Sequence, residues 1–541
     1  MGQDTDRAAD TAVERAKRPR SLHWPAVAVF LAFISVLLVF HEGKSLGFDT
    51  ANYEFSSGYS AIHGFGSWLS LPGQLQTYLD PQINGFYYLL IVTFEPRWVD
   101  AIIATLQSLS VTALAFCAWT IARDRTESKV LASWVAGVAG ASAVLAPNYY
   151  SELGSTFSDV LLTLPLVVAA GVLFRVLASR ATSREVALPT VVAGSLLGVV
   201  TALKFTNATY AVAIVISFGV ALLVMGSEPL RRRAGLLIRL VVAVAAGFAV
   251  VYTPEGLLLE RRYQDPLFPY FNGIFHSQYL QPGNWRDPAY ATTSFGLFWS
   301  HTLHLIVGGN TAHNGISEYP VRSPLLFLSL IVVAVFLVLD IASWRNRSTL
   351  FLEMSILVSY VLWDAVFGYY RYLGPLEVSI LSGVLVLVLL HFKHPIVPVA
   401  LLTVMVGLSP LYSIYTDWGR GSFAGSFFSV PVRQIDRYSS SRVLLAGPGP
   451  IGFVDPYLPR SATVIRIGGN LTGIMSVHFW RSVDESVRSA DASWTVIFAA
   501  TQPSEASDDL RSLGLPDELT HCRTFSTSVM PLAACKSAVI S

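Results

Sequence analysis

The sequence predicts an α-helical polytopic membrane protein with a small C-terminal α/β domain outside the membrane, and three observations support this fold class. The 541 residues are 53% hydrophobic and only 13% charged, with a mean hydropathy of +0.52. Apolar runs of the length that a bilayer requires recur up to about residue 415. Beyond Tyr412 the hydropathy falls and short strand-like runs appear. Such an apolar composition excludes an ordinary water-soluble fold of this size.

The apolar runs predict about eleven spans, since a span needs roughly 20 apolar residues. The first run follows a basic tail at residues 1–23 and no small-residue cleavage site follows it, so we expect an uncleaved first span. The runs begin near Trp24, Asp100, Val130, Phe157, Leu188, Ala208, Leu236, Pro324, Leu350, Gly374 and Pro395.

The distribution of Lys and Arg predicts the orientation of these spans. With the N-terminus inside, the inside connections are the more basic ones, although the outer loops, chiefly 42–99 and 254–322, cover more residues. The positive-inside rule therefore predicts a cytoplasmic tail and an extracytoplasmic C-terminus. The polar motifs of the loops then share the outer face.

Residues 416–541 predict the extracytoplasmic α/β domain, with strand-like runs RVLLAG, ATVIRIG and WTVIFAA. An oxidising compartment would permit a disulfide between Cys522 and Cys535, but spacing alone leaves the bridge open. The net charge of +1 predicts no nucleic-acid partner. The segment GPGPIG fits a dinucleotide pattern, yet its prolines and the following FVDPYLP favour a simple turn.

Asp49 is the strongest catalytic candidate, because GFDTANYEF places it at the membrane surface directly after the first span. A carboxylate there can act as a general base toward an acceptor hydroxyl. Its structural alternative is an N-cap of the helix that follows. Further along the same loop, Asp80 precedes an aromatic stretch expected to lie on the membrane surface, and either binds a sugar hydroxyl or caps that helix, with capping the favoured role.

Three further motifs at predicted outer ends contain candidate substrate-binding residues. Glu152 and Asp159 lie in PNYYSELGSTFSDV, where Asp159 enters an apolar run and either is functional or pairs with an internal cation. Lys204 in TALKFTNATY, beside Asn207, either pairs with a phosphate or snorkels to the interface.

In FGYYRYLGPLE, the guanidinium of Arg371, beside Tyr370, is suited to bidentate hydrogen bonding with a phosphate or pyrophosphate. Its alternative is an ion pair with Glu377 or with an acidic residue of another loop. The large outer loop interleaves aromatic rings with polar groups, which suits sugar binding but also an interfacial belt. Its candidate residues are Asp265, Phe268, Tyr270, Asn272 and Trp285.

The sequence contains no HExxH, CxxC, P-loop or G-x-S-x-G motif. His41, His63, His276, His301, His304 and His313 are scattered without the spacing of a metal site. No cofactor is therefore expected with certainty, and a divalent metal held by carboxylates stays open.

Together, Asp49 after the first span, the following surface-helix motif DPQINGFYYLL, and the segments PNYYSELGSTFSDV, LKFTNATY, DPLFPYFNGIF and YYRYLGPLE resemble the GT-C superfamily of multi-span glycosyltransferases. The resemblance covers most of residues 20–415 and is to bacterial membrane proteins, so it implies a bacterial plasma-membrane location. It implies transfer of a sugar from a polyprenyl-phosphate donor to a lipid or cell-envelope glycan, with Asp49 as base and Lys204 or Arg371 stabilising the departing phosphate. Asp49 lacks the second Asp of the family's usual paired spacing, so metal use and the exact base stay open.

Two other classes compete with this prediction. A transporter or flippase of lipid-linked sugars would place ionisable residues near mid-membrane. A scaffold with an outer binding domain would not need Asp49, Lys204 and Arg371 to converge, so the distances among them discriminate between the classes.

Overall fold

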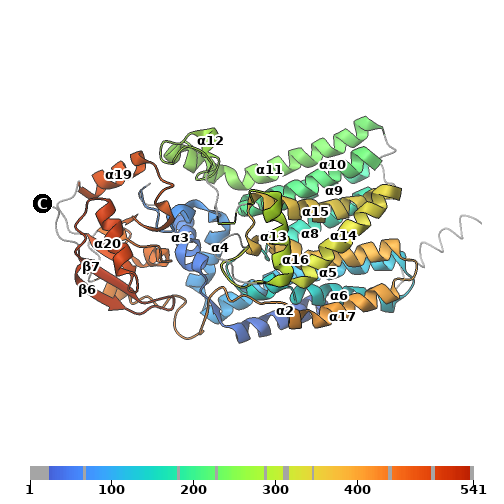
Figure 1. Ribbon diagram of the computed structural model, residues 1–541, viewed down its shortest axis with the longest axis horizontal. Coiled ribbons are helices and arrows are strands. Elements are labelled where there is room, and N and C mark those ends of the chain that lie inside the picture. Colours follow the sequence, from blue (N-terminus) through green and yellow to red (C-terminus); the bar gives the residue numbers. More distant parts are fainter. Residues whose placement is uncertain are drawn as a thin grey trace, which may run out of the picture.

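The computed structural model describes residues 24–64, 67, 69–179, 183–225, 229–284, 289–290, 292–308, 316–343, 346–436, 442–488 and 494–536. The basic tail, Trp285 and His313 lie outside these residues. An elongated helical bundle occupies one end of the molecule, and a sheet covered by helices occupies the other (Figure 1).

Each of the eleven predicted apolar runs contains a helix. Eight helices of the described residues are long and apolar enough to cross a membrane, while α6, α8 and α17 are shorter. The chain is an integral membrane protein, and the count of eleven spans stays a prediction. The bundle helices are α2 (Trp24–Glu42), α5 (Pro96–Arg125), α6 (Lys129–Val144), α8 (Thr163–Ala178), α9 (Ser183–Leu203), α10 (Ala208–Met225), α11 (Leu230–Tyr263), α14 (Pro324–Ser343), α15 (Arg347–Val366), α16 (Gly374–His391) and α17 (Ile396–Tyr412).

Local sequence signals fix several helix starts. Side chains of Ser128 and Asn346 accept capping bonds at the beginnings of α6 and α15. Pro96 and Pro375 lie in the first turns of α5 and α16, where a missing N–H costs nothing. The almost wholly apolar α16 is the most deeply buried span, surrounded by the other bundle helices.

Short elements between the spans build the loops. In Figure 1, α3 and α4 lie between the bundle and the sheet. The loop elements are η1 (Thr50–Glu54), α3 (Phe55–His63), η2 (Gln74–Tyr78), α4 (Pro81–Thr93), α7 (Pro147–Ser151), η3 (Phe205–Asn207), α12 (Asn272–Phe275), α13 (Phe295–Val307) and η4 (Tyr370–Leu373).

The C-terminal sheet has the order β4-β3-β5-β7-β6, with β3 parallel to β4 and β5, and β7 antiparallel to β5 and β6. The three predicted strand runs correspond to β3, β4 and β5. A disulfide joins Cys522 of β6 to Cys535 of β7. The elements are β1 (Lys44–Ser45), β2 (Arg420–Gly421), α18 (Val432–Asp436), β3 (Arg442–Leu445), η5 (Gly452–Tyr457), β4 (Thr463–Arg466), η6 (Gly469–Leu471), α19 (Val477–Arg488), β5 (Thr495–Ala499), α20 (Pro503–Ser512), β6 (Thr520–Phe525) and β7 (Leu532–Lys536).

The segment GPGPIG forms a turn after β3, as predicted. Gly447 has φ +84°, and the buried Arg466 donates to the carbonyl oxygens of Gly447 and Gly449. The short η5 follows instead of the long helix that a dinucleotide loop would precede.

The sheet packs against the first outer loop through an apolar core. Phe55 of α3 contacts the rings of Phe428 and Tyr457, and β1 of the loop pairs with β2. The first loop therefore lies between the bundle and the sheet, and both contribute to its position.

Candidate active site

Four charged side chains form a continuous network at the end of the bundle that faces the sheet. The Nη2 atom of Arg371 donates a hydrogen bond to Asp49 Oδ2 at 2.6 Å, and Lys204 Nζ donates one to Asp159 Oδ2 at 2.8 Å. Arg371 Nε lies 3.9 Å from the same Asp159 oxygen, which links the two pairs. We call these four residues the charged cluster. Asp49, Lys204 and Arg371 thus converge, as the enzyme prediction requires.

The contacts of the charged cluster decide between the alternative roles predicted for Asp49, Lys204 and Arg371. Asp49 makes no capping bond, because its carboxylate accepts from Arg371 and from the Tyr53 hydroxyl at 3.2 Å. Lys204 is buried against Asp159 and therefore does not snorkel. The partner of Arg371 is an acidic residue of another loop, not Glu377.

Short turns between the spans position Lys204 and Arg371. Lys204 lies directly after α9 and before η3, and Arg371 lies in η4 between α15 and α16. Gly368 has φ +66°, and a Cβ there would lie 2.0 Å from the Tyr290 carbonyl oxygen, so glycine permits the turn into η4.

Aromatic rings hold the two cations. The Arg371 guanidinium lies 4.1 Å from the Phe157 ring centroid and 5.3 Å from that of Tyr372. Lys204 Nζ lies 5.7 Å from the Tyr372 ring centroid. Such contacts fix a guanidinium plane without neutralising its charge.

Glu54 is a neighbouring acid that the sequence reasoning missed, although it lies within the motif GFDTANYEF. The wide helical turn of η1 brings it near Asp49, and its carboxylate accepts a hydrogen bond from Thr156. Burial, and then the charge of Asp49, raise the pKa of Glu54 to about 7. The sequence signal that could have identified Glu54 is its position five residues after Asp49 in the same motif.

Asp80 does not cap α4, so the favoured capping role is wrong. Its backbone is left-handed at φ +52°, which directs the carboxylate away from the helix, and the side chain makes no capping bond. The carboxylate instead accepts from the backbone N–H of Phe205, close to Lys204 and Asp159. Burial raises the pKa of Asp80 to about 7.

Glu152 and Asn207 lie beside the charged cluster. Glu152 is fully buried, and burial followed by the charge of Asp159 raises its pKa. Both side-chain polar atoms of the buried Asn207 lack a hydrogen-bond partner among the described residues. Unpaired amide atoms at such a place are available to a polar ligand.

Three residues predicted to bind substrate form hydrogen bonds with nearby segments and not with the charged cluster. Asp265 Oδ1 accepts from the Leu267 N–H at 2.8 Å, and Asn272 Nδ2 donates to the Gln281 carbonyl at 2.8 Å. The Tyr370 hydroxyl donates to Glu377 Oε1 at 2.7 Å. No hydrogen bond or ion pair in the described part of the chain joins these side chains to the charged cluster, so the structure does not bring them into it.

Two other candidates of the large outer loop have packing contacts. The Phe268 ring stacks on Tyr263 at a centroid distance of 3.9 Å, and the Tyr270 ring lies 5.9 Å from that of Phe205, next to Lys204. Of these two, Tyr270 is the one near the site.

A surface pocket of about 450 Å³ lies between the first loop and the sheet. Phe48, the neighbour of Asp49, forms part of its wall. The other lining residues are mainly polar: Gln74, Pro448, Gly469, Asn470, Thr472, Glu505, Asp508 and Asp509. The pocket combines one exposed ring with amides and carboxylates.

The chain has the fold of the GT-C superfamily, which its sequence motifs resemble. The chain is similar to two crystal structures of ArnT from Cupriavidus metallidurans, one bound to undecaprenyl phosphate and one in the apo state. Sequence identities are 14% and 13%, both TM-scores are 0.52, and each match covers 94% of this chain and 97% of ArnT.

The apo oligosaccharyltransferase from Archaeoglobus fulgidus matches with 12% identity and a TM-score of 0.44, covering 84% of this chain and 65% of that one. No protein-family model and no curated protein matches the sequence.

Proposed function

We propose that the protein is a membrane glycosyltransferase that moves a sugar from a polyprenyl-phosphate donor to a lipid or cell-envelope glycan acceptor. The charged cluster is the observation that supports this proposal most directly. It combines a reachable carboxylate with two fixed cations where the bundle meets the outer loops. The undecaprenyl phosphate bound by ArnT, which shares the fold, supports the class of donor.

Exposure supports Asp49 as the general base. Its side chain is 18% exposed, against 1% for Asp159, 5% for Lys204 and 6% for Arg371. Of the two acids in the charged cluster, Asp49 is therefore the one that an acceptor hydroxyl can approach. Asp159 serves as the counter-ion of Lys204 and orients it.

The proposed step is a displacement at the anomeric carbon. The acceptor oxygen forms a bond to that carbon, the bond to the phosphate oxygen breaks, and Asp49 takes the hydroxyl proton. Arg371 and Lys204 stabilise the charge that develops on the phosphate. A donor phosphate would compete with Asp49 for Arg371 and so free the carboxylate to accept the hydroxyl proton.

The neighbouring polar groups would bind the substrates. Asp80, Glu152 and Asn207 lie where they can orient hydroxyl groups of the donor sugar. The pocket beside Phe48 suits an acceptor glycan, because rings bind the apolar faces of sugars while amides and carboxylates bind the hydroxyl rims. Among the described residues, no group of three metal ligands is found at this site.

The proposal includes an orientation. The charged cluster and the sheet would be extracytoplasmic, and the tail at residues 1–23 cytoplasmic. The concentration of Arg at the opposite end of the bundle, as in the first turn of α11, supports this orientation.

Transfer of labelled sugar from a panel of polyprenyl-phosphate donors to membrane lipid or wall glycan tests the proposal, with purified wild type, Asp49→Asn and the control Asp124→Asn. Asp124 is an exposed carboxylate in the last turns of α5. We expect Asp49→Asn to lower turnover by about 100-fold or more, because the amide cannot accept the proton, and Asp124→Asn to keep it.

Equal turnover of wild type and Asp49→Asn would contradict the role of Asp49. Donor binding without transfer of any sugar would contradict the enzyme and favour a transporter of lipid-linked sugars.

A further inference from the structure

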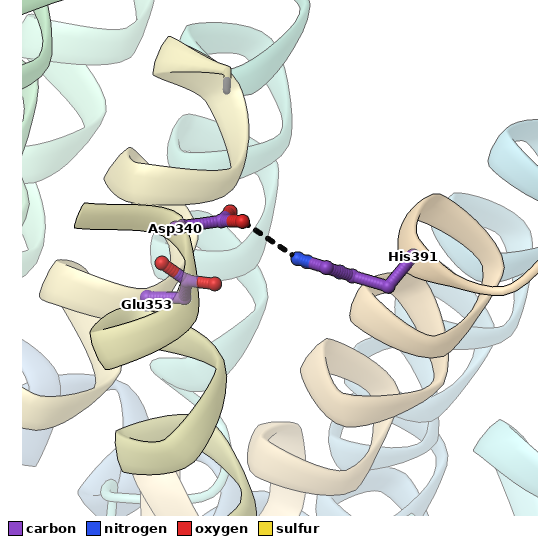
Figure 2. Close-up of side chains that lie close together, drawn as sticks. All are labelled: Asp340, Glu353 and His391. Carbon is purple, nitrogen blue, oxygen red and sulfur yellow. Dashed lines mark hydrogen bonds and ion pairs between the residues drawn. The ribbon is translucent and has the colours of Figure 1, made fainter. Parts of the chain in front are cut away.

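A second group of ionisable side chains lies at the end of the bundle away from the sheet. Asp340 of α14, Glu353 of α15 and His391 of α16 each offer a ligand atom, and these atoms all lie within 4.8 Å of one another. Figure 2 shows the two carboxylates side by side with the imidazole approaching from α16. We call these three residues the distal triad.

The distal triad is separate from the charged cluster. Gly374 at the beginning of α16 lies next to Asp159, since a Cβ there would be 3.5 Å from the Asp159 Cβ. His391 is the last residue of the same helix. At 1.5 Å rise per residue, the two ends of α16 are about 25 Å apart, so the distal triad takes no part in the proposed transfer.

The hydrogen bonds of His391 define the role of its second nitrogen. Nδ1 lies 2.8 Å from the Leu387 carbonyl oxygen, which only accepts, so Nδ1 carries a proton. In the neutral ring Nε2 is then an acceptor, yet it faces Asp340 Oδ1 at 2.9 Å. Two acceptors at this distance need a cation or an additional proton between them.

Glu353 adds a further negative group. The side chain is fully buried, and no amide, hydroxyl or cationic group of the described residues donates to its carboxylate oxygens. Its polar neighbour is the carboxylate of Asp340, which is also buried. A buried carboxylate without a donor is costly unless a cation compensates it.

We propose that the distal triad binds a divalent transition-metal ion of the Zn²⁺ class. One imidazole nitrogen and two carboxylates are typical ligands for this class, whereas Mg²⁺ and Ca²⁺ prefer oxygen ligands alone. The proton on His391 Nδ1, held by Leu387, leaves Nε2 free to coordinate. Bonds of about 2.0–2.2 Å around one ion require only small side-chain movements from the present separations.

The bound ion would connect the end of α14, the beginning of α15 and the end of α16. Because no single helix supplies two of the ligands, binding would stabilise their packing. We expect a structural role, with thermal stability as its readout.

The test uses the full-length, tag-free protein after treatment with a chelator and re-addition of Zn²⁺ or Co²⁺. We expect one tightly bound ion per chain, retained in millimolar Mg²⁺, and a higher melting temperature with Zn²⁺. Glu353→Gln and His391→Asn should each lose one equivalent of metal and the thermal shift, while the control Glu127→Gln, an exposed carboxylate, keeps both.

Co²⁺ absorption of the wild type provides evidence that does not depend on the variants folding. Intense visible bands of a low-coordinate site with a nitrogen ligand would support the proposal. Wild type that binds no ion, or a His391→Asn variant with unchanged stoichiometry, would overturn it.

Discussion

At the residue scale, the charged cluster pairs side chains that lie far apart in the sequence. Asp49 and Arg371 are 322 positions apart in sequence and form an ion pair at 2.6 Å. Buried charges of this kind are costly to assemble and contribute little net stability. Their concentration at one end of the bundle is therefore better explained by function than by stability.

Glu54 makes the stability of the protein depend on pH. Its pKa is raised from 4.5 to about 7, so the folded protein holds this proton more tightly than the unfolded chain does. The free energy of unfolding should then fall as pH rises from 4.5 to about 7, by at most about 3 kcal/mol. Glu54→Gln should flatten this decrease, since an amide can still accept from Thr156 but does not ionise.

Melting temperatures of wild type, Glu54→Gln and the exposed control Glu127→Gln between pH 4.5 and 8 check this prediction. The same pH dependence in Glu54→Gln as in wild type would show that another group is responsible.

At the element scale, α9 and α11 pack closely through small residues. A Cβ on Gly198 of α9 would lie 2.1 Å from the Val244 carbonyl oxygen, and one on Gly247 of α11 would lie 2.4 Å from that of Ser195. Small residues allow helix backbones to approach in this way inside a membrane. Since Lys204 directly follows α9, this contact also supports the charged cluster.

Gly198→Ala should therefore destabilise the protein by about 1–3 kcal/mol, because two backbones must separate to admit the methyl group. Gly235→Ala in α11 is the matched control, since its Cβ would meet no atom within 4 Å. Thermal unfolding of the two variants in one detergent is the measurement. A melting temperature of Gly198→Ala equal to that of Gly235→Ala would refute the close approach.

At the scale of the whole molecule, the C-terminal region fixes the loop that carries Asp49. The Leu75 N–H donates to Asn470 Oδ1, and the Asn470 N–H donates to Gln74 Oε1 at 2.7 Å. Gly452 packs so tightly that a Cβ there would lie 2.0 Å from the carbonyl oxygen of Asn52, within η1. The sheet thus supports the element that follows Asp49.

We expect Gly452→Ala to displace η1 and lower sugar transfer at least tenfold, a size typical of misplaced catalytic groups. The control Gly407→Ala in α17 adds a methyl group in open space and should keep full transfer. Assays of both variants at equal protein concentration provide the comparison. Full transfer by a folded Gly452→Ala protein would argue against this support.

Periodicity and composition determined the membrane class, the positions of the eleven apolar helices and the strands β3, β4 and β5, because hydrophobic burial acts on local patterns. The candidate Asp159 followed from the cost of placing charge in an apolar run. Asp49, Lys204 and Arg371 followed from charged side chains at the predicted outer ends of spans, where a base or a phosphate ligand could act. The likeness to the GT-C fold also followed from motifs in the chain.

Only the tertiary structure decided which charges are partners. It assigned Asp159 to Lys204 and Asp49 to Arg371, added Glu54, and gave Asp265, Asn272 and Tyr370 local roles. It also assembled the distal triad from three helices, whose members lie 13 and 38 residues apart in sequence. Ion pairs depend on distances of a few ångströms between remote segments, and no local pattern encodes those distances.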